Sequence, residues 1–315
     1  MILKRFSTVA TAGLFTTFFL LVGWKTIAPF NFTDLERYRV GFESKLYLFR
    51  VINLDPIRFV LSEGVWVYLF DDLYNRTGNI DVSFNIISFI CVMLCSAYII
   101  SKTKSAIYTI FLINPAFVNL GLEQIRSGLG AGLFFISLTV KNRILKSLLL
   151  FLSMCMHTVF FLVGSIYIIY LLFDRTKKFD IIKYNKLLTL SIISAISILI
   201  VIFREVILSS IGDRRAYSYF EQTSGIYLSV AWLTFIVTHY IYSKRDTLSF
   251  EACFFTFCVI TMASSLFFGI YGARFVALAI PALAVMASEI APNRQPLFFA
   301  QYIGFSGIYF FLWLQ

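Results

Sequence analysis

Arginine side chains stand near the points where apolar segments of the chain begin or end. They are Arg126, Arg204, Arg214, Arg215 and Arg274. A guanidinium group is planar and always charged, and its fork of N–H donors matches phosphate, diphosphate and carboxylate groups. Two interpretations follow. One is an anionic ligand, such as a lipid-linked phosphate, a nucleotide sugar or an anionic glycan. The other is a set of interfacial ion pairs, such as Glu123 with Arg126 or Asp213 with Arg214.

The two histidines call for different interpretations. His157 lies in an apolar run, where a neutral imidazole is either a hydrogen-bonded core side chain or a functional group, acting as a general base or as a ligand to a substrate hydroxyl or phosphate. His239 lies near Lys244 at the end of its apolar segment, and we expect it to be structural. Glu289 is expected to pair with Arg294 at a helix end.

The elements that must position these residues are membrane helices. Of 315 residues, 59% are hydrophobic and 14% are charged, whereas soluble domains are about half apolar and about a quarter charged. This composition excludes a soluble enzyme, a disordered chain and a disulfide scaffold. It predicts an all-α integral membrane protein, a single polytopic domain over 1–315 with roughly ten transmembrane segments. The five cysteines fall in apolar segments and are expected to be buried.

The chain carries 27 Lys and Arg residues against 17 Asp and Glu residues, a net charge of +10. Nucleic acid is not the expected partner, because no soluble basic face is present to bind it. Part of the positive charge anchors cytoplasmic loops, and the rest is available for an anionic ligand.

Two polar stretches are predicted to be external loops, 25–79 and 211–225. The first holds equal numbers of basic and acidic residues, which is untypical of a cytoplasmic anchor. Its part from Glu63 to Tyr74 carries four aromatic residues, Trp66, Tyr68, Phe70 and Tyr74, between charged residues, and it suits an interfacial helix. Apolar segments cover approximately 6–24, 80–100, 105–120, 127–140, 147–173, 187–211, 226–243, 251–270, 275–291 and 297–315.

Two of the apolar segments are expected to be interrupted. A single crossing by 147–173 would place most basic residues outside, against the positive-inside rule, so we favour a re-entrant hairpin that turns near His157. The five arginines then lie on the external side, and the lysine-rich loops lie inside. Asn114-Pro115 interrupts 105–120. The glycines around Arg126 indicate either tight helix packing or a broken helix with Arg126 at the lip of a cavity.

Several local patterns resemble one family when taken in order. Asp34-Leu-Glu-Arg-Tyr38 follows the first apolar segment, and Glu63-Gly-Val-Trp-Val-Tyr68 precedes the second. Then come Asn119-Leu-Gly-Leu-Glu-Gln-Ile-Arg126-Ser-Gly-Leu-Gly-Ala, Met156-His157-Thr158, Arg215-Ala-Tyr217-Ser-Tyr219 and Gly272-Ala-Arg274-Phe275. Together they resemble the EpsG-like branch of the Wzy-type polysaccharide polymerases over most of the chain. Thr158 departs from the pattern, which has a serine after the histidine.

The resemblance implies a multi-pass glycosyltransferase of the bacterial inner membrane with a GT-C-like fold. Such an enzyme polymerises undecaprenyl-diphosphate-linked oligosaccharide repeats on the periplasmic face to form O-antigen, capsule or exopolysaccharide, and it releases undecaprenyl diphosphate. The lipid-linked glycan and the lipid bilayer are the partners that it implies, with a chain-length regulator and a flippase as further candidates. No cofactor is implied.

The reaction assigns roles to the candidate residues. Arg126, Arg215 and Arg274, with Arg214, are candidates for stabilising the leaving diphosphate. His157, Asp34 and Glu63 are the candidate proton acceptors, and Tyr38, Tyr217 and Tyr219 suit stacking on sugars. No residue cluster demands a metal ion. The alternative is a transporter or flippase for a lipid-linked or anionic glycan, which would also place arginines beside broken helices. Its site would lie near mid-membrane, whereas these arginines gather toward one face.

Overall fold

The computed structural model describes residues 2–28, 32–175, 185–210, 225–267 and 273–314. Every regular element in these ranges is helical, as the composition predicts. The chain divides into two compact units, Met1–Gly164 with Phe310–Gln315, and Ser165–Tyr309. All five cysteines are buried and free of disulfides, which confirms their interpretation as core residues.

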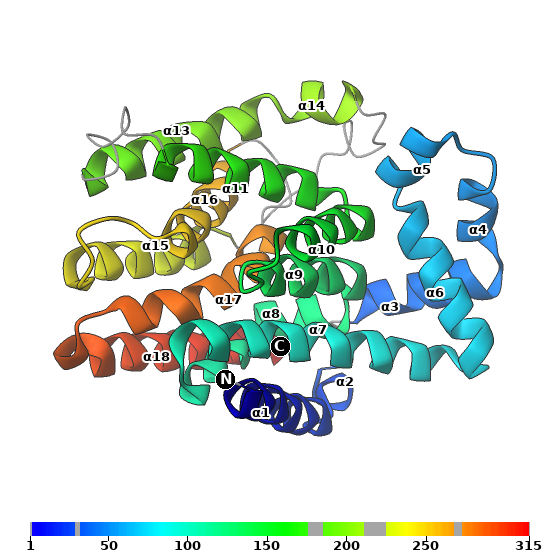
Figure 1. Cartoon of the computed structure of the whole chain (residues 1–315), viewed down its shortest axis with the longest axis horizontal. Coiled ribbons are helices and arrows are strands. Elements are labelled where there is room, and N and C mark those ends of the chain that lie inside the picture. Colours follow the sequence, from blue (N-terminus) through cyan, green and yellow to red (C-terminus); the bar gives the residue numbers. More distant parts are fainter. Residues whose placement is uncertain (1, 29–31, 176–184, 211–224, 268–272, 315) are drawn as a thin grey trace. The chain divides into compact units, whose positions relative to one another are not determined.

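The core of the first unit is built around a long apolar helix, α7 (Ile80–Thr103). It packs against α1 (Ile2–Leu21) and α9 (Ile125–Ser137), and α9 packs in turn against α10 (Arg143–Met156) (Figure 1). Glycine permits the close approach of α7 and α9. A Cβ atom on Gly128 would lie 2.5 Å from the Leu120 carbonyl oxygen and 2.9 Å from Cys91 Sγ. Tight helix packing therefore accounts for this glycine.

The charged stretch 25–79 folds into short helices: α2 (Trp24–Ile27), α3 (Thr33–Glu43), α4 (Leu46–Val51), α5 (Pro56–Leu61) and α6 (Gly64–Thr77). The sequence Asp55-Pro56 begins α5, because the Asp55 carboxylate accepts N–H bonds from Ile57 and Arg58 at 3.1 and 3.0 Å and proline suits the first turn of a helix. The helix α6 covers the segment predicted to be interfacial.

Both interruptions occur in the structure. The segment 105–120 divides into a 3₁₀ helix, η2 (Ala106–Leu112), and α8 (Pro115–Leu122), and the Asn114 side chain accepts the Ala116 N–H at 3.0 Å. The segment 147–173 divides into α10 and α11 (Val159–Arg175), with His157 as the residue that ends α10. The break at His157 is thus confirmed, while the re-entrant path through a membrane stays a prediction.

The second unit is centred on α16 (Phe250–Ser265), nearly all of whose residues are buried. It packs against α13 (Lys186–Ile202), α15 (Gly225–Tyr242) and α17 (Ala273–Glu289). The unit also contains α14 (Arg204–Ser210), η5 (Pro292–Arg294) and most of α18 (Gln295–Leu314). Gln301 of α18 joins α15 by donating to Thr234 Oγ1 at 2.7 Å and accepting from Thr238 Oγ1 at 3.0 Å.

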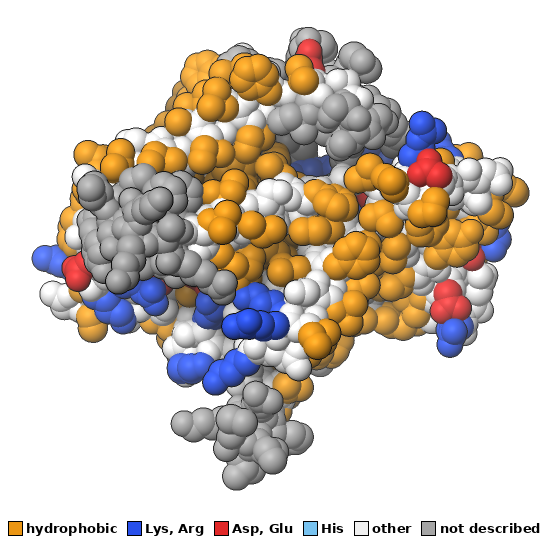
Figure 2. Space-filling view, turned by 45° about the horizontal axis from the view of Figure 1, so that its top comes forward, with side chains coloured by type: hydrophobic (Ala, Val, Ile, Leu, Met, Phe, Trp, Pro, Cys, Tyr) orange, Lys and Arg blue, Asp and Glu red, His pale blue; other side chains and the backbone are white. Residues whose placement is uncertain are grey.

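Three helical stretches in the described residues are long and apolar enough to cross a membrane, Ser7–Ile27, Ile80–Thr103 and Pro292–Trp313. Five shorter apolar helices accompany them. Large apolar side chains lie on the surface, among them Leu14, Ile144 and Phe267 at 74%, 82% and 86% exposed. Figure 2 shows apolar side chains over much of the face it draws. Such a surface is typical of a helical membrane protein.

Candidate functional site

Three polar residues from distant parts of the chain meet inside the first unit. Glu63 immediately precedes α6, Arg126 is the second residue of α9, and His157 ends α10. Glu63 and His157 are 7% and 5% exposed, and the Arg126 side chain is 23% exposed. Buried charged groups of this kind need partners. These three residues, which we call the Glu63 cluster, are partners for one another.

The Glu63 carboxylate is the centre of the cluster. Its Oε2 atom forms an ion pair with Arg126 Nη1. Its Oε1 atom accepts the Thr158 backbone N–H at 3.3 Å and lies 3.5 Å from His157 Nδ1. The alternative interpretation of Arg126, an ion pair with Glu123, is wrong. Glu123 Oε1 instead accepts the backbone N–H of Asp34 at 3.3 Å.

The backbone at Glu63 is held in an unusual conformation. Its φ angle is +62°, in the left-handed region that residues with a Cβ atom rarely adopt. The next residue, Gly64, lies against the Phe59 ring, and a Cβ atom on it would come within 2.4 Å of that ring. This tight turn directs a buried carboxylate toward α9 and α10. Conformations of this kind are frequent at functional sites.

The His157 ring has two arrangements open to it. The Val159 backbone N–H lies 3.1 Å from Nδ1, and in this arrangement Nδ1 accepts and the proton of the neutral ring is on Nε2. When Nδ1 carries the proton instead, it faces Glu63 Oε1, and Nε2 becomes the acceptor. A carboxylate beside one ring nitrogen stabilises the imidazolium that forms when the other accepts a proton.

Tyr38 and Asp34, both on α3, also lie near Arg126. The Arg126 guanidinium carbon lies 5.9 Å from the centroid of the Tyr38 ring, within the range of a cation–π contact. The Asp34 carboxylate is close enough to interact electrostatically with Arg126. It also pairs with the exposed Arg37 at 3.2 Å. Five candidate residues of the sequence analysis therefore lie together in the first unit.

The remaining candidates lie elsewhere in the chain. Arg274 is the second residue of α17 in the second unit, where it is partly buried. Arg204 begins α14. Arg214, Arg215, Tyr217 and Tyr219, and with them nearly all of the predicted loop 211–225, lie outside the described residues.

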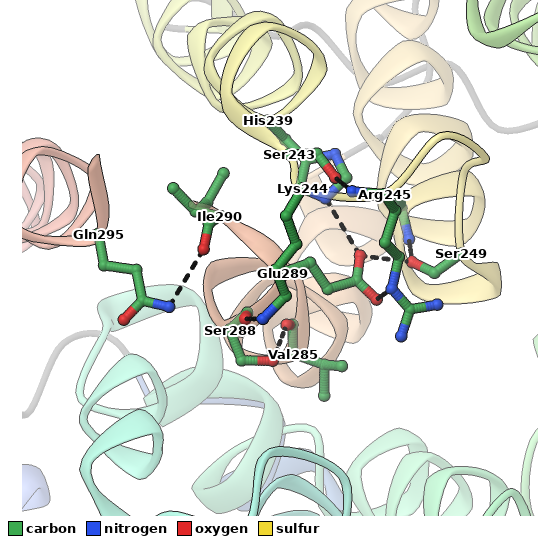
Figure 3. A network of polar contacts seen from close by, with 11 residues as sticks. His239, Ser243, Lys244, Arg245, Ser249, Val285, Ser288, Glu289, Ile290 and Gln295 are labelled. Atoms are coloured by element: carbon green, nitrogen blue, oxygen red, sulfur yellow. Dashed lines mark hydrogen bonds and ion pairs between the residues drawn. The ribbon is translucent and has the colours of Figure 1, made fainter. Parts of the chain in front are cut away.

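A second polar network joins the ends of α15 and α17 in the second unit (Figure 3). Glu289 Oε2 lies 3.1 Å from His239 Nε2 and accepts the Ser249 hydroxyl at 2.9 Å. Arg245 Nε lies 3.1 Å from the other carboxylate oxygen. The predicted pair of Glu289 with Arg294 is therefore wrong. The Arg294 guanidinium lies over the Tyr242 ring, 5.3 Å from its centroid.

The network also explains the structural role expected of His239, which is 2% exposed and hydrogen-bonded to Glu289. Backbone hydrogen bonds also join the end of α15 and the turn after it to the end of α17. The Lys244 N–H donates to the Glu289 carbonyl at 3.0 Å, and the Ala291 N–H donates to the Tyr242 carbonyl at 2.9 Å. Sequence spacing could not indicate these partners, because they come from a turn that folds back onto the end of α17.

The Glu63 cluster combines a guanidinium, an imidazole and a carboxylate, with the Tyr38 ring beside it, so it can bind an anion and move a proton. Among the residues that the structure describes, no group of three or more His, Cys, Asp or Glu residues could hold a metal ion.

Comparisons of the chain with family models, with curated proteins and with solved structures find no match.

Proposed function

We propose that the protein is a membrane glycosyltransferase that polymerises undecaprenyl-diphosphate-linked oligosaccharide repeats. The observation that carries this proposal is the arginine Arg126, held by a buried carboxylate beside a histidine and a tyrosine. The apolar helices and apolar surface support a lipid-linked substrate in a membrane. The proposed protein is multi-pass, GT-C-like and resident in a bacterial inner membrane, with its site on the periplasmic side.

In the proposed reaction, an acceptor sugar hydroxyl attacks the anomeric carbon of the growing chain. A new C–O bond forms, and the bond from that carbon to the diphosphate oxygen breaks. Undecaprenyl diphosphate leaves with the electron pair, and negative charge develops on its oxygen. In this proposal Arg126 stabilises that charge, because a fixed guanidinium needs little reorganisation during the reaction. The Tyr38 ring, which lies beside Arg126, is the proposed stacking partner of a sugar.

The proton of the acceptor hydroxyl must pass to a base. Glu63 is the least suitable of the three candidates, because both of its oxygens are engaged by Arg126, the Thr158 N–H and the His157 ring. We assign it a positioning role for Arg126 and His157. His157 Nε2 is the better acceptor, with Glu63 stabilising the imidazolium, and Asp34 is the other candidate.

Deleting the gene tests the proposal against its alternative. In the deletion strain we expect long glycan chains to disappear from the chain-length ladder while single repeat units still reach the cell surface. Complementation with the wild-type gene restores the ladder. A flippase or transporter gives a different result, because without it no repeat units reach the surface. A normal ladder in the deletion strain would contradict the polymerase assignment.

Cysteine labelling tests the proposed topology. We place Ser44→Cys, an exposed position on the stretch 25–79, and Lys178→Cys, between α11 and α13, on opposite sides of the membrane. In spheroplasts a membrane-impermeant maleimide is expected to label Ser44→Cys at once and Lys178→Cys only after permeabilisation. The native cysteines are buried and give a low background. Immediate labelling of both positions would contradict the re-entrant hairpin.

A further inference from the structure

Three buried polar atoms in and beside the α8–α9 turn, from the last part of α8 to the first turn of α9, have no hydrogen-bond partner among the described residues. They are Asn119 Oδ1, Gln124 Oε1 and Arg126 Nε. The first two play no part in the Glu63 cluster. Gln124 is only 7% exposed, so its amide is almost completely removed from solvent. A buried polar atom without a partner is unfavourable, and each such atom in a native fold requires an explanation.

The local fold brings these residues together. The backbone N–H groups of Glu123 and Gln124 both donate to the Asn119 carbonyl, at 3.0 and 2.8 Å, and so close the turn after α8. Gln124 then stands at the position that precedes α9, but its side chain makes no capping bond. The side chains preferred at such a position are Ser, Thr, Asp and Asn, which satisfy the first N–H groups of the helix. The Gln124 amide is thus buried but does not cap α9.

The chemistry of the three atoms specifies what would satisfy them. The two amide oxygens are acceptors and require donors, whereas Arg126 Nε is a donor and requires an acceptor. A molecule that presents hydroxyl donors next to an anionic acceptor fits this set. A sugar attached to a phosphate has this chemistry, since its ring carries hydroxyl groups and its phosphate carries acceptor oxygens. A phosphate alone would give Arg126 Nε an acceptor, but it would give the two amide oxygens no sugar hydroxyl as a donor.

We infer that the α8–α9 turn binds the first sugar of the lipid-linked substrate, with Asn119 and Gln124 accepting from its hydroxyl groups and Arg126 contacting the adjoining phosphate. This inference rests on the proposed function and adds specificity residues to it. Asn119 and Gln124 distinguish a glycosylated diphosphate from a bare one. Arg126 contributes to binding of both, because both contain the diphosphate.

Binding measurements with the full chain in nanodiscs test this assignment. The two probes are farnesyl diphosphate and the same diphosphate bearing a single hexose. Asn119→Leu and Gln124→Met remove the amides at nearly constant volume. We expect each to weaken binding of the glycosylated probe about ten-fold, as loss of a buried hydrogen bond implies, and to leave binding of farnesyl diphosphate unchanged. Arg126→Lys is expected to weaken binding of both probes.

Asn75→Leu is the matched control, because Asn75 is an exposed residue of α6 in the same unit, and it should bind both probes as the wild type does. Thermal unfolding of each variant shows whether it folds. Unchanged binding of the glycosylated probe by folded Asn119→Leu and Gln124→Met would overturn the inference while leaving the role of Arg126 intact. Equal loss of both probes would also overturn it. Failure of the wild type to bind either probe would overturn the proposed function and this inference together.

Discussion

Replacing Arg126 with alanine is expected to abolish long glycan chains while single repeat units still reach the cell surface. Among the candidate diphosphate ligands that lie in the described residues, Arg126 belongs to the Glu63 cluster. Loss of one group that stabilises developing charge typically slows an enzyme about 100- to 1000-fold. A slowing of this size would remove the upper part of the chain-length ladder. The measurement is a glycan gel from a deletion strain that carries the variant.

A structural cause of the same result must be separated from a catalytic one. Arg126→Ala leaves Glu63 buried without its cation, which destabilises the fold. The double variant Arg126→Ala/Glu63→Gln removes that buried charge, so we expect it to unfold at a higher temperature than the single variant while remaining inactive. Arg76→Ala, the loss of an exposed arginine whose side chain is 75% exposed, should leave the ladder unchanged. Restored polymerisation in the double variant would show that Arg126 acts only as a partner for Glu63.

Two helix boundaries follow from local sequence. Proline lacks an N–H donor and an asparagine before it can cap the next helix, so Asn114-Pro115 indicated a break that the structure contains. His157 is a polar residue in an apolar run, and the helix ends there. These features depend on a few neighbouring residues and on backbone hydrogen bonding. They can therefore be inferred without knowledge of the tertiary fold.

The partners of charged residues do not follow from local sequence in the same way. Glu123 lies three residues before Arg126, a spacing that forms ion pairs within one helix. Here a turn separates α8 from α9, so the two side chains do not share a helix face. The partner is Glu63, which precedes α6. The helix α6 packs against α10, and α10 packs against α9, which carries Arg126. Both residues are candidates from their type and place in the sequence, but their pairing depends on packing between helices distant in the chain.

The second large expected effect is a loss of stability when Glu289 is replaced. We expect Glu289→Ala to destabilise the second unit, because it leaves His239 Nε2 and Ser249 Oγ buried without their acceptor. Each buried group left unsatisfied costs roughly 1–3 kcal/mol. Arg245, whose side chain is 53% exposed, can be solvated and adds little. The expected result is a Tm lower by several degrees in detergent, measured by thermal unfolding of the purified protein.

Two further variants isolate the cause of that loss. Glu289→Gln keeps an acceptor oxygen for Ser249 and His239, so it should be destabilised less than Glu289→Ala. Asp246→Ala removes an exposed carboxylate from the same turn and should leave the Tm close to that of the wild type. Since Ser249 caps α16 by accepting the Ala252 N–H at 3.1 Å, the network fixes the start of the central helix of the unit as well as the end of α17. Equal Tm values for Glu289→Ala and Asp246→Ala would show that the turn is held by its backbone bonds alone, and the carboxylate would then need a role other than stability.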